Sequence, residues 1–186
     1  ALDCRQWVDT ARAGGLNGLI LTAKHHDGFC LWPTRTTAHQ ISASPFRAGR
    51  GDVVRELAEA CREDGLDLGL YCSPWDRNHP DYARPAYIKV FHAQWRELLT
   101  NYGPLCECWF DGANGGDGYY GGAREKRNID ARTYYRYQTI WRECHRRQPQ
   151  AVIFSDAGPD VRWAGNESGM TSATCWAKIR PAGFAP

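Results

Sequence analysis

Short runs of apolar residues recur along the chain at intervals of roughly 40 residues. Few polar residues alternate within these runs, as expected for strands that are covered on both faces of a sheet. We predict four strands on this basis: residues 18–23, 66–72, 105–110 and 151–155.

Between these runs, apolar residues recur at the spacing of amphipathic helices. Asp52 is placed to cap one helix, and Gly65 is placed to end it. We predict four helices: residues 3–13, 53–64, 88–99 and 133–147. Strands that alternate with helices in this way build a parallel sheet with right-handed crossovers.

Polar residues stand at the end of every predicted strand. His25 and His26 follow the first strand, Tyr71 lies at the end of the second, and Asp111 and Asp156 follow the third and fourth. Such side chains at the carboxyl ends of strands favour an α/β fold of the (β/α)8 TIM-barrel type over a dinucleotide-binding sheet, and no G-x-G-x-x-G follows the first strand. A complete barrel takes about 250 residues. The 186 residues therefore predict a partial barrel of about four βα units, a fragment of a single domain truncated at both ends.

Composition narrows the classes of function. Hydrophobic residues make up 42% of the chain, enough for a core, and the net charge is +2. Lys and Arg form no basic stripe, so no nucleic-acid partner is expected, and the mixed run 124–127 is interpreted as a solvated loop. No apolar stretch approaches the ~20 residues that span a bilayer, so no membrane is expected. Residues 1–15 show no leader, but a removed or missing one stays open, and a secreted or periplasmic parent protein is compatible with the sequence.

Eight cysteines are present, with neither a C-x-x-C pair nor the spacing of zinc ligands. Most lie in or near apolar runs and are interpreted as small buried residues. Cys106 and Cys108 share one face of a strand and are poorly placed for a mutual disulfide. The cysteines leave the compartment undetermined.

Asp111 is the strongest single candidate for a functional residue. It follows an aromatic strand and precedes a glycine-rich loop, a position that fixes a side chain and leaves it open to a ligand. It is a candidate nucleophile, metal ligand or structural acid. A metal lacks support, because His25 and His26 are adjacent on an extended run and should point to opposite faces. For this pair, hydrogen bonding to a polar ligand and an ordinary core or surface role both stay open.

Cleavage of a glycosidic bond would require a second carboxylate. Asp156, Asp160 and Glu167 are the candidates beyond the fourth predicted strand. Aromatic residues in the loops would suit stacking on a sugar's apolar face, although burial is the commoner fate of a single tryptophan. These residues are Trp32, Trp75, Tyr119, Tyr120, Trp163 and Trp176.

Four ordered motifs contain most of these candidates. They are A-K-H-H-D-G-F at 23–29, Y-C-S-P-W-D at 71–76, W-F-D-G-A at 109–113, and S-D-A-G-P-D at 155–160 with R-W at 162–163 and G-N-E at 165–167. Together they resemble the family 29 α-L-fucosidases over essentially the entire chain. The S-P-W-D and G-N-E segments are most similar to the branch that acts on α-1,3/1,4-linked fucose.

The resemblance implies a retaining exo-α-L-fucosidase, with Asp111 as nucleophile and Glu167 as general acid/base. It implies a fucosylated oligosaccharide or glycoprotein glycan as partner, and neither a cofactor nor a metal. Glu167 is expected ~5 to 5.5 Å from Asp111, and Asp156 is expected to support the rim through hydrogen bonds. The residues expected to bind the sugar are His25, His26, Tyr71, Trp75, Trp32 and Trp163.

The chain departs from the family pattern in two places. Residues 171–174 differ from a segment that commonly contains glycine, and the first and last strands of the barrel are absent. Unpaired sheet edges then predict that the isolated chain folds and turns over poorly. Two alternatives stay open: an inactive fucose-binding fragment or pseudoenzyme, and a metal-dependent barrel hydrolase.

Overall fold

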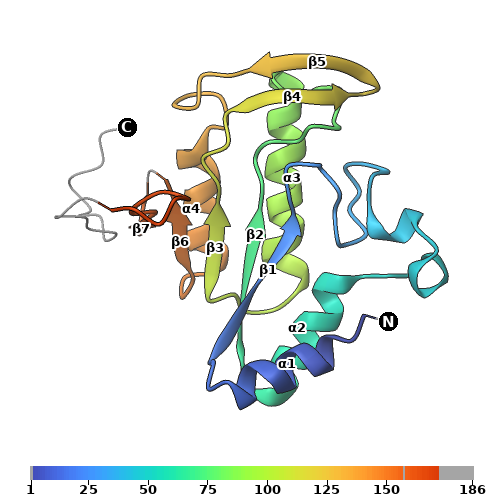
Figure 1. Cartoon of the computed structure of the whole chain (residues 1–186), viewed down its shortest axis with the longest axis vertical. Helices are drawn as coiled ribbons and strands as arrows, with labels where there is room; N and C mark the ends of the chain where they lie inside the picture. The colour runs from blue at the N-terminus through green and yellow to red at the C-terminus, as the bar shows by residue number, and fades with distance from the viewer. Residues whose placement is uncertain (1, 157, 172–186) are drawn as a thin grey trace.

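A parallel sheet forms the centre of the computed structural model, which describes residues 2–156 and 158–171. Five strands lie side by side in the order β1-β2-β3-β6-β7 (Figure 1). The first four confirm the predicted strands, while the short fifth strand has no apolar run to predict it. Their bounds are β1 Gly18–Lys24, β2 Asp67–Cys72, β3 Glu107–Phe110, β6 Val152–Ser155 and β7 Val161–Arg162.

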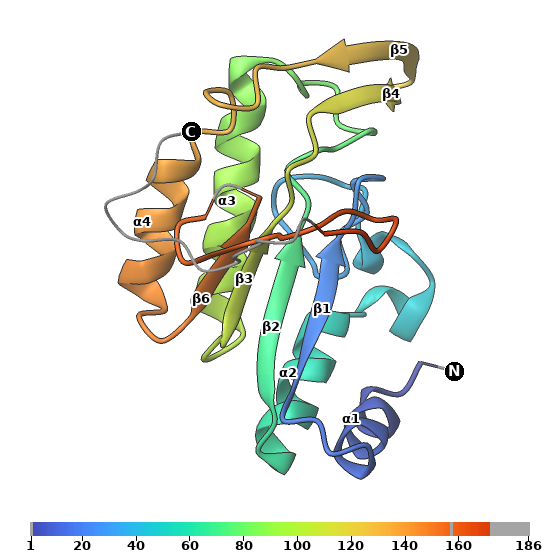
Figure 2. The same cartoon turned by 60° about the vertical axis from the view of Figure 1, so that its left-hand side comes forward.

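The described residues form four α-helices: α1 Cys4–Ala13, α2 Val53–Asp64, α3 Pro85–Asn101 and α4 Tyr137–Arg147. Helix α1 precedes β1, and the other three lie between strands of the sheet. Asp52 caps α2 by accepting from the Arg55 backbone N–H, and Gly65 ends it with a φ of 70°, as predicted. Helix α4 begins later than predicted, because Arg136 takes a left-handed conformation and separates the helix from the turn before it. Figures 1 and 2 show α2, α3 and α4 behind one face of the sheet.

The two faces of the sheet differ in cover. Leu70, Cys108 and Ile153 pair in register and are fully buried on the helix side. On the opposite face, Ile20 and Val152 are 45% and 40% exposed. The prediction that both faces are covered is therefore wrong for the described residues. A sheet with helices on one face only is what part of a (β/α)8 barrel presents, because its other face lines the barrel interior.

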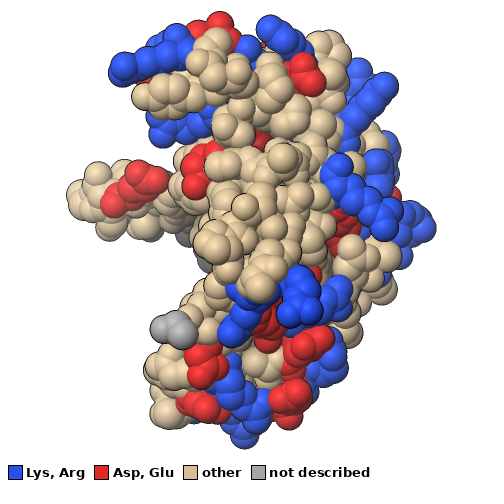
Figure 3. Space-filling model, turned by 90° about the vertical axis from the view of Figure 1, so that its right-hand side faces the viewer, with Lys and Arg blue, Asp and Glu red and all other residues tan. Residues whose placement is uncertain are grey.

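The glycine-rich segment after Asp111 was predicted to be a loop but forms an antiparallel hairpin of β4 (Gly115–Tyr120) and β5 (Ala123–Asn128). The mixed run 124–127 lies in β5. Backbone bonds attach the hairpin to the segment after β2: Tyr119 N–H donates to Arg77 O at 2.7 Å, and Gly121 N–H donates to Asn78 O at 2.8 Å. The hairpin lies at the top of Figure 1, and Figure 3 shows basic and acidic side chains mixed upon it.

The seven cysteines that lie within the described residues are free thiols. No helix among the described residues is long and apolar enough to cross a membrane. Nor does that part of the chain gather three or more His, Cys, Asp or Glu side chains that could hold a metal ion. Cys175 and Trp176, with most of the segment 171–174, lie outside the described residues.

Candidate active site

Asp111 follows β3 directly, and Tyr71 holds it from the neighbouring strand β2. The Tyr71 hydroxyl donates to Asp111 Oδ2 at 2.6 Å. Tyr71 is 5% exposed, and burial and the Asp111 charge raise the pKa of its hydroxyl. The phenol therefore stays protonated and donates to the carboxylate.

The two histidines lie in a turn rather than on the strand. Strand β1 ends at Lys24, and Gly28 N–H donates to His25 O at 3.0 Å to close the turn. The ring centroids of His25 and His26 are 4.0 Å apart. The prediction that they point to opposite faces is wrong, because strand alternation stops where the strand stops. His26 Nε2 lies 3.9 Å from Asp111 Oδ2, and the His25 ring stacks on Tyr71 at 5.8 Å.

Ser73 determines which nitrogen of His26 carries the proton. Its hydroxyl donates to Trp75 O at 3.0 Å, so it must accept from His26 Nδ1, 2.7 Å away. Burial, and then the charge of His25, lower the pKa of His26. A neutral His26 therefore presents the lone pair of Nε2 on the side of Asp111, where a ligand hydroxyl can donate to it.

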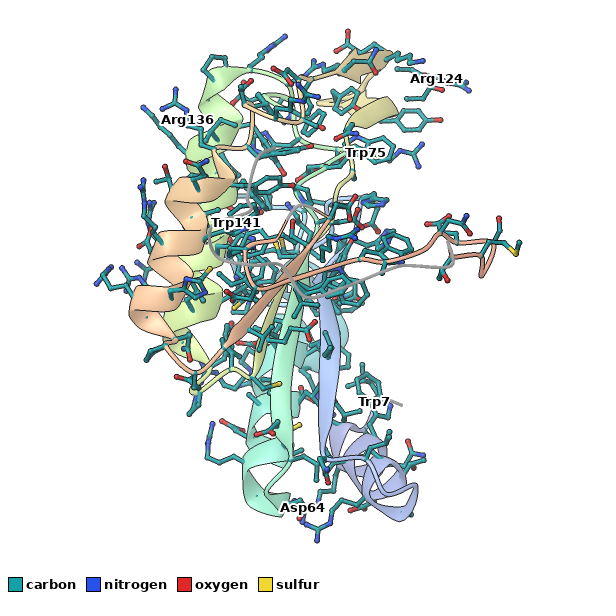
Figure 4. All side chains as sticks on the ribbon, turned by 90° about the vertical axis from the view of Figure 1, so that its left-hand side faces the viewer. Trp7, Asp64, Trp75, Arg124, Arg136 and Trp141 are labelled. Atoms are coloured by element: carbon teal, nitrogen blue, oxygen red, sulfur yellow. The ribbon has the colours of Figure 1, made fainter. Side chains whose placement is uncertain are left out.

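Trp75 forms a wall of the site under the hairpin, as Figure 4 shows. Its ring lies 5.1 Å from that of His26, and its Nε1 donates to the Tyr120 hydroxyl at 3.0 Å. A Cβ atom at Gly116 would lie 3.2 Å from the indole, a tight contact, so glycine favours this close approach of β4. Trp32, by contrast, is 1% exposed and donates to Glu97 on α3 at 2.8 Å. The structure places Trp32 in the core, away from this cluster.

Two acids that follow β6 have different surroundings. Asp156 follows β6 as Asp111 follows β3, and a Cβ atom at Gly112 would lie 1.8 Å from its Oδ2. Burial and the Asp111 charge raise the pKa of Asp156. Asp160 Oδ2 accepts from His145 Nε2 and from Ile153 N–H, both at 2.8 Å, and so ties α4 to β6. Asp160 thus provides hydrogen-bonded support between α4 and β6, and the supporting role expected of Asp156 stays a prediction.

Residues 163–171 project from the uncovered side of the sheet, opposite the helices (Figure 4). Asn166 Oδ1 shapes this segment by accepting from Ser168 N–H at 3.0 Å and Met170 N–H at 3.1 Å. Glu167 and Trp163 are exposed there. In the part of the chain that the structure describes, Glu167 makes no hydrogen bond or ion pair with Asp111, and the expected retaining distance stays a prediction.

A cavity of about 600 Å³ opens beside the cluster, near the start of α4. Gly112, Asp156 and Tyr137 line it, whereas Asp111, Tyr71 and His26 do not. The Tyr71 hydroxyl and His26 Nε2 instead lie 2.6 Å and 3.9 Å from Asp111 Oδ2. We therefore locate the candidate active site at Asp111.

Comparison with known proteins identifies the family of the chain. The model of the family described as alpha-L-fucosidase matches residues 1–174. The chain belongs to the alpha-L-fucosidase family. It is 48% identical over 176 residues to alpha-L-fucosidase 1 of Arabidopsis thaliana and 48% identical over 177 residues to a putative alpha-L-fucosidase 1 of Oryza sativa subsp. japonica. A crystal structure of a glycoside hydrolase 29 family member from an unknown rumen bacterium superposes with a TM-score of 0.87 at 55% identity.

These similarities cover most of this chain but a minor part of each relative. The alignments take in 94% and 95% of this chain and 32% of each plant protein. For the rumen bacterial protein, the shares are 91% of this chain and 31% of the relative. The chain thus spans about a third of the length of these alpha-L-fucosidase relatives.

Sequence reasoning missed two residues that shape the candidate site. Ser73 sets the His26 tautomer, and its position just after a strand is a signal that could have found it. Tyr137 donates from its hydroxyl to the backbone carbonyl of Asp111 at 2.8 Å and so fixes the turn after β3. No local signal marks Tyr137, because it lies 26 residues further along the chain.

Proposed function

We propose that the protein containing this chain is a retaining exo-α-L-fucosidase, and that the chain is part of its single catalytic barrel domain, truncated at both ends. Its substrate would be an oligosaccharide or glycoconjugate with terminal α-linked fucose. The observation that carries the proposal is the Asp111 carboxylate at the end of β3, held by the Tyr71 hydroxyl and facing the acceptor nitrogen of His26.

Asp111 would act as the nucleophile. Because Tyr71 occupies Oδ2, we infer that Oδ1 attacks the anomeric carbon while the bond to the leaving oxygen breaks. Glu167 would give its proton to that oxygen, then remove a proton from the water that releases fucose from Asp111. The position of its segment on the uncovered side of the sheet, toward which the barrel interior would lie, supports this role.

Sugar recognition would rest on the histidine turn and the aromatic wall. His26 Nε2 would accept a hydrogen bond from a fucose hydroxyl, with His25 beside it, and Trp75 and Trp163 would offer apolar surfaces. We also propose that the fucose is α-1,3- or α-1,4-linked. This part of the proposal rests on the S-P-W-D and G-N-E segments of the sequence.

Replacing Asp111 tests the proposal directly. In the complete domain, Asp111→Ala should lower turnover of an aryl α-L-fucoside by several orders of magnitude, and azide should restore part of it with a β-fucosyl azide as product. Asp9→Asn, an exposed site on α1, is the matched control and should leave turnover unchanged. If the unaltered domain binds fucose but shows no turnover, the result would instead support the alternative of an inactive fucose-binding fragment or pseudoenzyme.

Glu167 is tested through the leaving group. Glu167→Gln should greatly slow hydrolysis of fucosyl oligosaccharides, whose leaving alkoxide needs a proton. It should spare activated aryl fucosides in the first step, because their phenolate leaves unaided. If the variant and the unaltered domain have equal kcat/KM values on oligosaccharides, Asp156 becomes the candidate for the general acid. Asp156→Asn should then slow the hydrolysis of oligosaccharides.

A further inference from the structure

A buried ion pair lies directly beneath the histidine turn. Lys24 and Asp76 are 0% and 1% exposed, and Lys24 Nζ lies 3.8 Å from Asp76 Oδ2. Nζ also donates to Tyr87 Oη at 3.0 Å and Gln94 Oε1 at 2.8 Å, both on α3. A buried ion pair costs desolvation that its own attraction often fails to offset, so stability alone is a weak reason for this one.

Asp76 supports the turn through close packing. Its Oδ1 accepts from the backbone N–H groups of Asn78 at 3.0 Å and His79 at 2.8 Å. A Cβ atom at Gly28 would lie 2.1 Å from the same oxygen, and Gly28 has a φ of 80°. The turn from His25 to Gly28 therefore rests on the Asp76 carboxylate, with glycine required at the contact.

Backbone bonds join the same two segments on either side of that contact. Ser73 N–H donates to Lys24 O at 2.9 Å, and Arg77 N–H donates to His26 O at 2.8 Å. The Ser73 hydroxyl then contacts His26 Nδ1. The backbone and the ring of His26 are thus both fixed to residues 73–77, and the Lys24–Asp76 pair fixes that segment to β1 and α3.

We propose that Lys24 and Asp76 are positioning residues of the active site, which act through His26 to aim its Nε2 at the sugar beside Asp111. The inference rests on the proposed fucosidase function. A carboxylate suits this place because it accepts two backbone N–H groups on one oxygen and faces the ammonium with the other. An apolar side chain of similar size would fill the space and hold neither segment.

The test uses Asp76→Asn and Lys24→Met in the complete domain, with Gln148→Leu as the control. Gln148 is also buried and bonds three backbone groups, but at the amino end of β3. For Asp76→Asn, we expect kcat/KM for an aryl fucoside to fall 10-fold or more, because small misplacement of an active-site group can cost about 100-fold. The 15N shifts of the His26 ring should also move toward a mixture of tautomers. Gln148→Leu should lower the melting temperature without either change.

The double variant Lys24→Met/Asp76→Leu separates positioning from stability. Relative to Asp76→Asn, we expect the double variant to recover melting temperature but not kcat/KM. If Asp76→Asn does not fold, the same measurements are made on Gln94→Leu, which removes a hydrogen-bond partner of Lys24. Full activity in the double variant, or an unchanged His26 spectrum in Asp76→Asn, would overturn the inference. Lack of fucose release by the unaltered domain would instead refute the proposed function, and the His26 spectrum would still test the positioning role.

Discussion

The two oxygens of Asp111 are not equivalent. Oδ2 accepts the hydrogen bond of Tyr71 at 2.6 Å and lies nearest to His26 Nε2. The hydrogen bond from Tyr71 fixes the position of Oδ2 at the end of β3. Among the residues that the structure describes, none donates a hydrogen bond to Oδ1, which is therefore the oxygen that we expect to attack.

Removing the Tyr71 hydroxyl should therefore affect turnover more than binding. A hydrogen bond to a charged group is worth about 1.5–3 kcal/mol, so Tyr71→Phe should lower kcat roughly 10- to 100-fold with a small change in KM. Tyr134→Phe removes a hydroxyl that donates to Arg84 O, outside the site, and serves as the control. Steady-state kinetics of both variants in the complete domain would measure this. A change in KM alone would assign Tyr71 to sugar binding.

At the residue scale, what could be predicted followed from position relative to strand ends. Asp111, Tyr71 and His26 are candidates because the carboxyl ends of parallel strands lie at one edge of the sheet, and the structure brings the three together. The geometry of the histidine pair was not found, since the exact end of β1 decides whether the rings alternate. Tyr137 and Lys24 act through contacts distant in sequence, which no local pattern reveals.

At the element scale, the β4–β5 hairpin depends on glycines where side chains cannot fit. Gly115 has a φ of 94°, and a Cβ there would lie 2.4 Å from Arg127 O. Gly122 has nearly the same φ, 95°, with nothing within 4 Å of an added Cβ. The two glycines separate backbone strain from crowding, because only Gly115 combines both.

Gly115→Ala should accordingly be more damaging than Gly122→Ala. Both substitutions carry backbone strain of about 1–3 kcal/mol, and overpacking adds about 1–3 kcal/mol at Gly115. Hydrogen exchange of the hairpin amides and fluorescence of Trp75 should respond to Gly115→Ala, because β4 lies against that indole. Equal exchange rates in the two variants would show that the crowding at Gly115 relaxes without cost.

The same glycines explain why this element was predicted as a loop. Several glycines in the segment weaken a strand pattern and usually indicate turns, and here they permit a strand to pass close to other backbone. The start of α4 was also placed too early, because the apolar spacing continues through residues 133–136 while Arg136 breaks the helical backbone. At both the hairpin and the start of α4, the residue pattern predicts a different conformation from the one observed, because tertiary contacts decide the backbone conformation there.

At the scale of the molecule, burial keeps three histidines neutral. Burial lowers the pKa of His26, His79 and His92 from the ordinary value of 6.5. Below pH 6.5, the unfolded chain therefore binds more protons than the folded chain. The stability these histidines contribute is fully present above pH 6.5 and is lost as pH falls toward their folded pKa values.

Acidification should therefore destabilise the domain, by at most about 1.4 kcal/mol per pH unit for each histidine. His92→Gln keeps a donor for Tyr135 O, to which His92 Nε2 is bonded at 2.9 Å, and removes the titrating group. Chemical unfolding between pH 5 and pH 7.5 should show a smaller loss of stability for His92→Gln than for the unaltered domain. Parallel pH dependences would exclude His92 as a contributor.

The uncovered face of the sheet gives the last prediction, which concerns the barrel as a whole. If that face lines a barrel interior in the complete domain, Ile20 is buried there, although it is 45% exposed here. Ile20→Ser should then cost the complete domain about 2–5 kcal/mol, as large-to-small core substitutions do, and raise the soluble fraction of the isolated chain by reducing its apolar surface. Leu16, 55% exposed just before β1, is the control, and Leu16→Ser should leave the complete domain within about 0.5 kcal/mol. A stability of the complete domain unchanged by Ile20→Ser would mean that this face does not close into a barrel.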